Sequence, residues 1–238
     1  MIEAEWWEYD DADEMADAVA GDVGFILDSA IDARGAALIA VPGGSTPGPA
    51  LAKLASQKRD WKRVTIIPTD DRLVPMGDAL SNVTAIARLF LAKGARVVPL
   101  TSEKAPDVKA AGRSADAVLQ DLPWPPDLVW LGVGTDGHTA SIFPGPDFDE
   151  AINGPKERRA LGVTPEPLPK EAPVPRVTLS RSAIVGARTL IITCVGDKKR
   201  AVLEQAIEQG AAGTTPIARV LAECELPVDI HWASDATA

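Results

Sequence analysis

Short apolar runs that alternate with helix-patterned segments constrain the fold of this chain most strongly. Four runs lie at 36–41 (AALIAV), 63–68 (RVTIIP), 127–133 (DLVWLGV) and 189–195 (TLIITCV), and shorter strand-like segments lie at 95–100 and 227–233. A strand without polar alternation is buried on both faces, as in a parallel sheet covered by helices. The intervening segments 13–33, 48–56, 81–92, 107–120 and 198–209 are patterned as helices.

This alternation predicts an α/β fold, Rossmann-like, with a mostly parallel sheet and helices on both faces. The chain has 238 residues with no break in composition, so we expect a single domain over residues 1–238. The segment 163–175 (VTPEPLPKEAPVP) holds five prolines, which remove amide donors and disfavour helix, and it is expected to form an exposed loop.

The charge of the chain bears on its partners and its location. Thirty-four acidic against 24 basic residues leave a net charge of −10, which argues against nucleic acid as a partner. No stretch is long enough to span a bilayer, and the acidic start lacks the layout of a signal peptide. We therefore expect a cytoplasmic protein with a small-molecule partner, no membrane association, and an oligomeric state left open between monomer and weak homodimer.

Ligands of open α/β sheets bind beyond the carboxyl ends of the strands, so the loops that follow the strands are the candidate sites. The first loop contains Gly43, Gly44, Ser45 and Thr46. Thr46 is expected to cap the helix that follows, whose free amides would suit a phosphate. A plain strand-to-helix turn would use the same residues. The sequence lacks the Lys-Ser/Thr pair of a Walker loop and a GxGxxG element.

The second loop, PTDDRLVP at 68–75, is followed by Ser81 and Asn82 at the start of a helix. Arg72 could grip a phosphate with paired hydrogen bonds, and Asp70 or Asp71 could orient its guanidinium. The alternative is a surface ion pair of little energetic weight.

The third loop, VGTDGHTASIFPG at 133–145, carries one of the two histidines. His138 is the natural general base, Asp136 could fix its tautomer, and amides around Gly137 could hold an oxyanion. We expect His138 near the start of a short helix. A structural histidine bonded to backbone is the alternative, and it is the interpretation that we favour for His231, inside a strand-like run.

Other chemistries have no support in the sequence. A GxSxG elbow is absent, and no histidine, cysteine or carboxylate cluster has the spacing of a metal site. We therefore expect neither a metal nor a cofactor.

The motifs VPGGSTPG, TDDRLVP with SNVTA, LGVGTDGHTASIFPG, RVTLS and VGDKKRAVL together resemble the 6-phosphogluconolactonase family, in its order, over roughly residues 36–221. The GxGxDGHTASxFPG element is the most specific of them. Related glucosamine-6-phosphate deaminases typically continue after the histidine as Ile-Ala-Phe-Asn-Glu, whereas this chain continues as Thr-Ala-Ser-Ile-Phe. Two positions depart from the family pattern, because Asp71 stands where glutamate is common and Gly48 where arginine is frequent.

The resemblance implies hydrolysis of 6-phospho-D-glucono-1,5-lactone to 6-phospho-D-gluconate, the second step of the oxidative pentose phosphate pathway. It implies that Lys199 and Arg72 bind the phosphate together with residues 43–46, that Arg176 adds positive potential, and that Asp70 or Asn82 meets the sugar hydroxyls. The alternatives are a sugar-phosphate isomerase or deaminase of the same superfamily and a sugar-phosphate sensor without turnover.

Overall fold

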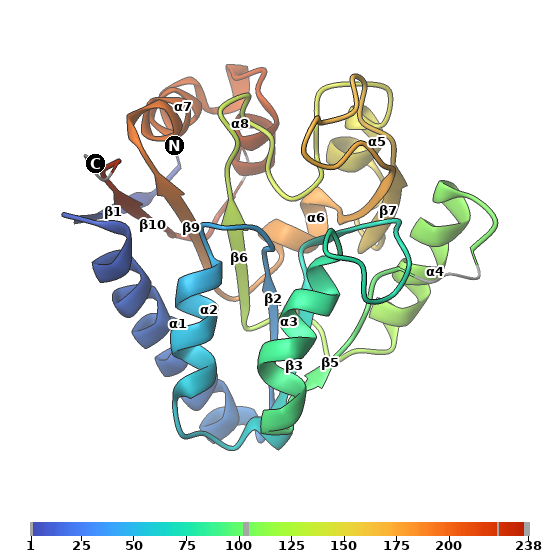
Figure 1. Ribbon diagram of the computed structural model, residues 1–238. Coiled ribbons are helices and arrows are strands. Elements are labelled where there is room, and N and C mark those ends of the chain that lie inside the picture. The colour runs from blue at the N-terminus through green and yellow to red at the C-terminus, as the bar shows by residue number, and fades with distance from the viewer. Residues whose placement is uncertain (1, 102–104, 223, 236–238) are drawn as a thin grey trace.

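A seven-stranded parallel sheet forms the centre of the molecule, as this computed structural model shows for residues 2–101, 105–222 and 224–235 (Figure 1). All of its neighbouring strands pair in parallel. Their order across the sheet is β1 (Ala4–Tyr9), β10 (Val228–Ala233), β9 (Leu190–Val195), β6 (Leu128–Gly132), β2 (Ala37–Val41), β3 (Val64–Pro68) and β5 (Arg96–Val97).

The four apolar runs are confirmed as the central strands, because both faces of the sheet are buried. In β2, Leu38 and Ala40 face one apolar cluster, whereas Ile39 and Val41 face the other. Such period-two alternation between two dry faces explains why the sequence shows continuous apolar runs instead of apolar–polar alternation.

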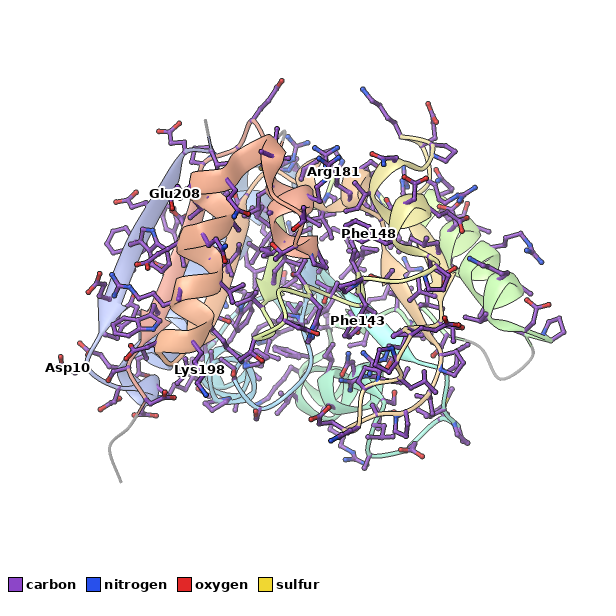
Figure 2. All side chains as sticks on the ribbon, turned by 90° about the horizontal axis from the view of Figure 1, so that it is seen from above. Asp10, Phe143, Phe148, Arg181, Lys198 and Glu208 are labelled. Atoms are coloured by element: carbon purple, nitrogen blue, oxygen red, sulfur yellow. The ribbon has the colours of Figure 1, made fainter. Side chains whose placement is uncertain are left out.

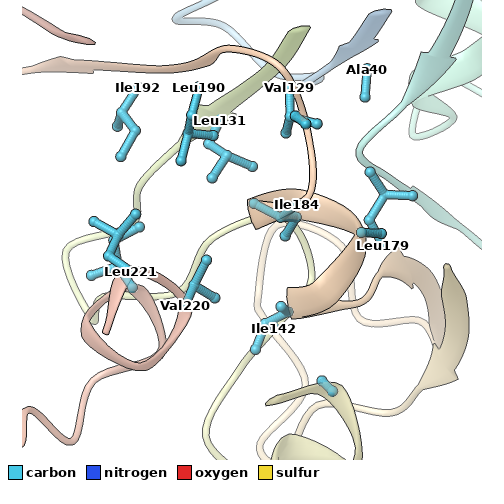
Figure 3. Packing of buried hydrophobic residues seen from close by; sticks show 14 of the residues in the cluster. Ala40, Val129, Leu131, Ile142, Leu179, Ile184, Leu190, Ile192, Val220 and Leu221 are labelled. Atoms are coloured by element: carbon cyan, nitrogen blue, oxygen red, sulfur yellow. The ribbon is translucent and has the colours of Figure 1, made fainter. Parts of the chain in front are cut away.

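Helices cover both faces of the sheet (Figure 1). One apolar cluster packs α1 (Ala12–Arg34), α2 (Gly48–Ser56) and α3 (Asn82–Phe90) on the sheet. The other packs α4 (Val108–Gln120), α5 (Phe148–Asn153), α6 (Arg181–Val185), α7 (Asp197–Gln209) and α8 (Pro216–Leu221). Figure 3 shows side chains of β6 and β9 opposite Ile184 of α6 and Val220 and Leu221 of α8.

Local signals in the sequence explain where the longest helix begins and ends. The side chain of Asp11 accepts hydrogen bonds from the amides of Asp13 and Glu14 at the start of α1. Gly35 ends the helix with φ of +80°, a left-handed conformation that favours glycine.

A second, antiparallel sheet of three strands was not expected. It consists of β4 (Asp70–Arg72), β8 (Arg176–Leu179) and β7 (Ala160–Val163). The segment RVTLS therefore pairs with the loop after β3 and not with the main sheet. The strand expected over 95–100 is reduced to Arg96–Val97, and β1 had not been predicted at all.

Candidate active site

Four loops with polar side chains meet at one edge of the main sheet. The strands β9, β6, β2 and β3 are consecutive in the sheet and parallel, so their carboxyl ends lie side by side. The segments that follow them carry Lys199 in the first turn of α7, His138, residues 43–46, and Arg72 in β4. This is the edge at which open α/β sheets bind ligands.

Asp136 and His138 form a carboxylate–imidazole pair after β6. Asp136 Oδ1 lies 2.5 Å from His138 Nδ1 and accepts a second hydrogen bond, of 3.1 Å, from the His138 amide. The hydrogen bond from His138 lowers the pKa of Asp136, which keeps this carboxylate ionised at neutral pH. With Nδ1 donating to the carboxylate, Nε2 is the basic nitrogen of the ring.

The glycines of this loop allow the pair to form. A Cβ at Gly134 would overlap the imidazole of His138, so only glycine permits this approach. Gly137 has φ of +80°, and its amide donates a 3.0 Å hydrogen bond to the carbonyl of Gly134. The Gly137 amide is therefore engaged within the turn. Of the amides around Gly137 that were expected to hold an oxyanion, this one is not free.

Thr215, just before α8, is a residue that the sequence had not indicated. A Cβ at Gly137 would lie 2.9 Å from the Cβ of Thr215, so the two residues are in close contact. The hydroxyl of Thr215 is buried and has no hydrogen-bond partner among the described residues. No local motif marks this residue, because its proximity to Gly137 arises only when α8 packs against the loop.

The expectation of a helix beginning near His138 is wrong. The chain instead makes a tight turn with a bridge between Thr139 and Ile142, and Ala140 has φ of +47°. This left-handed conformation costs a non-glycine residue about 1–2 kcal/mol. The turn brings Ser141 Oγ to 2.5 Å from Asp70 Oδ2, which ties the loop after β6 to the loop after β3.

The loop after β3 is held by Asp71. This carboxylate is fully buried and accepts hydrogen bonds from the amides of Arg72, Asn82 and Val83, so it supports the start of α3. Burial raises the pKa of Asp71, and the three amide bonds oppose that rise. The aspartate side chain is shorter than that of glutamate, which is common at this position in the family. The hydrogen bonds of Asp71 therefore determine how closely β4 and the start of α3 approach each other in this chain.

Arg72 is oriented by acceptors other than the expected carboxylates. Its Nη1 donates to the Leu80 carbonyl at 2.9 Å and to Asn82 Oδ1 at 2.8 Å, whereas its buried Nε has no partner. The expected orienting role of Asp70 or Asp71 is therefore wrong. Both Asp70 and Asn82 are buried and hydrogen-bonded within the protein, so they position neighbouring groups in this structure.

The glycine-rich loop lies against the same residues. A Cβ at Gly43 would overlap the carboxamide of Asn82, which explains the need for glycine at this position. The expected cap by Thr46 is wrong, because Pro47 occupies the N-cap position of α2 without a side-chain cap. Within the part of the chain that the structure describes, the amides of residues 43–46 and the hydroxyls of Ser45 and Thr46 have no hydrogen-bond partner.

Arg176 is buried beside the site and does not reach into solvent. It is 4% exposed, and its Nη2 donates a 3.0 Å hydrogen bond to the Ala172 carbonyl. In the small sheet it is the register partner of Arg72. Burial lowers the pKa of the Arg176 guanidinium, and the nearby Asp70 carboxylate opposes this effect.

A cleft of about 620 Å³ opens between the loop after β6, the start of α7 and the proline-rich loop. Its lining includes Gly134, Asp136, His138 and Lys199, together with Phe143 and residues 166–171. Lys199 forms no hydrogen bond or ion pair with any described residue, and the neighbouring Lys198 is exposed to solvent. Figure 2 shows Lys198 in the first turn of α7, and Phe143 apart from that helix across the view.

The structure therefore distributes the predicted residues over two adjoining groups. Asp136, His138 and Lys199 line the cleft. Gly43, Asp70, Arg72 and Asn82 contact one another along the same sheet edge but are not among its lining residues. Phe143, Ser141 and Thr215 were missed. The first two lie within the histidine motif, whereas Thr215 had no signal in the sequence.

Two further observations concern metals and membranes. Over residues 2–101, 105–222 and 224–235, no group of three or more histidine, cysteine or carboxylate side chains is placed to hold a metal ion. None of the helices in these ranges is both long and apolar enough to cross a membrane.

The fold and the site define an α/β protein of the sugar-phosphate isomerase and lactonase type. The chain belongs to the glucosamine-6-phosphate isomerase/6-phosphogluconolactonase family, whose model matches residues 10–232.

Individual relatives match over nearly their whole length. The chain is 38% identical over 232 residues to the 6-phosphogluconolactonase of Mesorhizobium japonicum, covering 96% of this chain and 94% of that protein. It is 37% identical to the enzyme of the same name from Rhizobium meliloti, covering 94% and 97%. The crystal structure of a 6-phosphogluconolactonase from Shewanella baltica superposes with a TM-score of 0.87 at 32% identity, covering 97% of this chain and 98% of that one.

Proposed function

We propose that this protein hydrolyses 6-phospho-D-glucono-1,5-lactone to 6-phospho-D-gluconate, the second step of the oxidative pentose phosphate pathway. The observation that carries the proposal is the pairing of His138 with Asp136 in a cleft that also contains Lys199, a cation with no hydrogen-bond or ion-pair partner among the residues that the structure describes. The curated relatives named 6-phosphogluconolactonase, at 31–38% identity over most of the chain, support the substrate.

The phosphate end of the substrate needs cations within an acidic protein. Lys199 supplies an ammonium at the cleft, and Arg72 supplies a guanidinium. Over the described ranges, neither the Lys199 ammonium nor the Arg72 Nε has a hydrogen-bond partner. The amides and hydroxyls of residues 43–46, including those of Gly44 and Ser45, add donors. These groups offset the net charge of −10 locally.

The reaction then needs one proton to be moved twice. His138 Nε2 removes a proton from a water molecule as the water oxygen bonds to C1 of the lactone, and the carbonyl becomes an oxyanion. Collapse of this intermediate breaks the bond between C1 and the ring oxygen, and the imidazolium returns the proton to that oxygen. General-base catalysis of this type contributes about 10²–10⁴-fold, and oxyanion stabilisation adds to it.

Asp136 keeps the imidazole in the tautomer that the reaction requires and stabilises the imidazolium that forms. Asp70 and Asn82 support the site through hydrogen bonds within the protein. The Asp70 carboxylate accepts a hydrogen bond from Ser141, and the Asn82 carboxamide accepts one from Arg72 and donates one to the Asp70 carbonyl. The sequence-based assignment of these two residues to the sugar hydroxyls is replaced by a supporting role.

We also propose that residues 1–238 act as one domain, in the cytoplasm, on a small-molecule partner. The two apolar clusters share the same sheet, which supports a single folding unit. The net charge of −10 disfavours nucleic acid.

The test is a continuous assay of lactone hydrolysis with freshly generated substrate, by pH-stat or by a coupled dehydrogenase, with spontaneous hydrolysis subtracted. We expect rapid turnover by the wild type and a loss of about 10²–10⁴-fold in kcat for His138→Ala, with KM little changed. His138→Gln, which keeps a polar side chain but no base, serves as the second variant. Ammonia release from glucosamine 6-phosphate, or tight binding of 6-phosphogluconate without lactone turnover, would overturn the proposal.

A further inference from the structure

The candidate base His138 is one of three side chains that form a stack with Phe143 in the middle. The rings of His138 and Phe143 are stacked, with centroids 4.3 Å apart and planes inclined by 18°. The guanidinium carbon of Arg176 lies 5.0 Å from the centroid of the same phenyl ring. The phenyl ring of Phe143 therefore contacts both the imidazole and a cation, which are contributed by different parts of the chain.

Arg176 is buried and is held by one hydrogen bond and one aromatic contact. It lies in the buried strand β8, is 4% exposed, and is tied through Nη2 to the Ala172 carbonyl at the end of the proline-rich loop. Its guanidinium contacts the face of an aromatic ring, a favourable cation–π arrangement. Arg176 also does not line the cleft that contains His138 and Lys199.

The hydrogen bond from His138 Nδ1 to Asp136 leaves the imidazole ring free to tilt. A bond at Nδ1 selects the tautomer and the direction of one ring edge, but the ring can still tilt about the line through that bond. A flat partner on the face of the imidazole removes this tilt. Phe143 is that partner, because its ring is nearly parallel to the imidazole.

We propose that Phe143 and Arg176 are positioning residues for His138: Phe143 holds the plane of the imidazole, and Arg176 holds Phe143. This inference rests on the proposed lactone hydrolysis, since positioning matters only if His138 is the base. It also assigns Arg176 a role other than the positive potential that the family resemblance implies. An intact stack keeps Nε2 aligned with the attacking water, and a disturbed stack reduces the fraction of productive geometries.

The test separates kcat from KM in Phe143→Leu, Phe143→Tyr, Arg176→Met and Arg176→Lys. We expect Phe143→Leu and Arg176→Met to lower kcat by about 3- to 10-fold, the range set by one aromatic contact, with KM for the phosphorylated lactone unchanged within about twofold. Phe143→Tyr keeps the aromatic face and should retain wild-type kcat. Phe148→Leu is the matched control, because Phe148 is a half-buried aromatic of α5 outside the stack.

Proton NMR gives a readout that is independent of activity. The chain has two histidines, so His138→Ala assigns the ring signals of His138 and His231. The Cε1 proton of His138 should be shifted upfield by the ring current of Phe143, and should move toward the position of a free histidine in Phe143→Leu but not in Phe143→Tyr or Phe148→Leu. Unchanged melting temperatures would show that the variants are folded. If Arg176→Met does not fold, Arg176→Lys and the Phe143 pair still decide the question.

Two outcomes would overturn the inference. Wild-type kcat in Phe143→Leu would show that the stack does not align the base. A rise in KM for the phosphorylated lactone in Arg176→Met or Arg176→Lys, with kcat unchanged and with the preference over plain gluconolactone lost, would make Arg176 a phosphate ligand. An inactive wild-type protein would refute the proposed function instead, and the histidine signal would still show whether the stack exists.

Discussion

Asp136→Asn tests the link between the geometry of the site and its chemistry most directly. The carboxylate accepts two hydrogen bonds from His138, at Nδ1 and at the amide, and loses its charge on substitution. An asparagine can keep the amide bond, but its NH₂ group can donate to Nδ1 and so favour the tautomer in which Nε2 carries the proton. That tautomer cannot accept a proton from water.

The size of the expected loss in kcat depends on how exposed the two side chains are. The side chains of His138 and Asp136 are 33% and 54% exposed, so solvent screens their interaction and the upper range for buried charge pairs does not apply. A hydrogen bond to a charged group contributes about 1.5–3 kcal/mol when partly shielded, and we take the lower part of that range for the loss. At about 1.4 kcal/mol per tenfold, kcat should fall about 10- to 30-fold.

The assay is initial-rate hydrolysis of fresh 6-phosphogluconolactone over a range of concentrations. We expect KM to stay within about threefold, because the phosphate is bound elsewhere. Asp60→Asn is the control, since Asp60 is an exposed carboxylate in a surface ion pair with Arg63. A kcat within twofold of the wild type for Asp136→Asn would refute the reasoning that this carboxylate selects the tautomer.

Three more variants test other parts of the site and the core. Lys199→Ala should raise KM for the phosphorylated lactone about 10- to 100-fold and leave hydrolysis of plain gluconolactone nearly unchanged, with the solvent-facing Lys198→Ala as control; equal loss on both substrates would contradict a phosphate contact. Thr215→Val removes a buried hydroxyl that has no partner among the described residues, so it should raise the free energy of unfolding in a urea titration by about 1 kcal/mol. If that hydroxyl serves the substrate, the variant should also be less active. A less stable variant would show that the hydroxyl is satisfied in the native state. Burial lowers the pKa of His231 to about 4 from a usual 6.5, so between pH 4 and 6.5 the unfolded chain binds more protons than the folded protein. The free energy of unfolding should therefore fall by up to about 3 kcal/mol as the pH decreases from 6.5 to 4. A His231→Gln variant with the same dependence of stability on pH would exclude His231 as its source.

The environment of His231 supports this last expectation. The ring is 1% exposed, its Nδ1 is hydrogen-bonded to Tyr9 Oη at 2.9 Å, and it stacks on the rings of Tyr9 and Trp7. Asp22 Oδ2 lies 3.7 Å from Nε2 and is half exposed, so it compensates the burial only weakly. The structural interpretation of His231 agrees with this arrangement, in contrast to His138 on its partly exposed loop.

The loop after β6 combines several features that are unfavourable for stability. Ala140 is in a left-handed conformation, the hydroxyl of Thr215 is unsatisfied, and His138 is held by a turn that only glycine permits at position 134. Such features persist when the surrounding structure determines them, and they are common at functional sites. The hydrogen bonds from Ser141 to Asp70 and to Thr178 supply that support here.

The sequence by itself determined the four central strands, the main helices that pack on them, and which loops after the strands carry polar side chains. These features act locally, so they can be recognised in a linear pattern. They are the apolar runs of a sheet that is buried on both faces, the helix caps such as Asp11 and Gly35, and the glycines at 134 and 137. The motif around His138 also allowed the family to be recognised, since it holds the base and its carboxylate two residues apart.

The tertiary structure decided how these segments are combined. The order of the strands places the loops after β9, β6, β2 and β3 side by side, and no local signal encodes that order, because it depends on which faces pack best against which helices. The same holds for the antiparallel pairing of Arg176 with Arg72, and for the contact of Thr215 with Gly137. Residues distant along the chain meet there only because burial of two apolar clusters on one sheet brings them together, and that burial is a property of the whole fold.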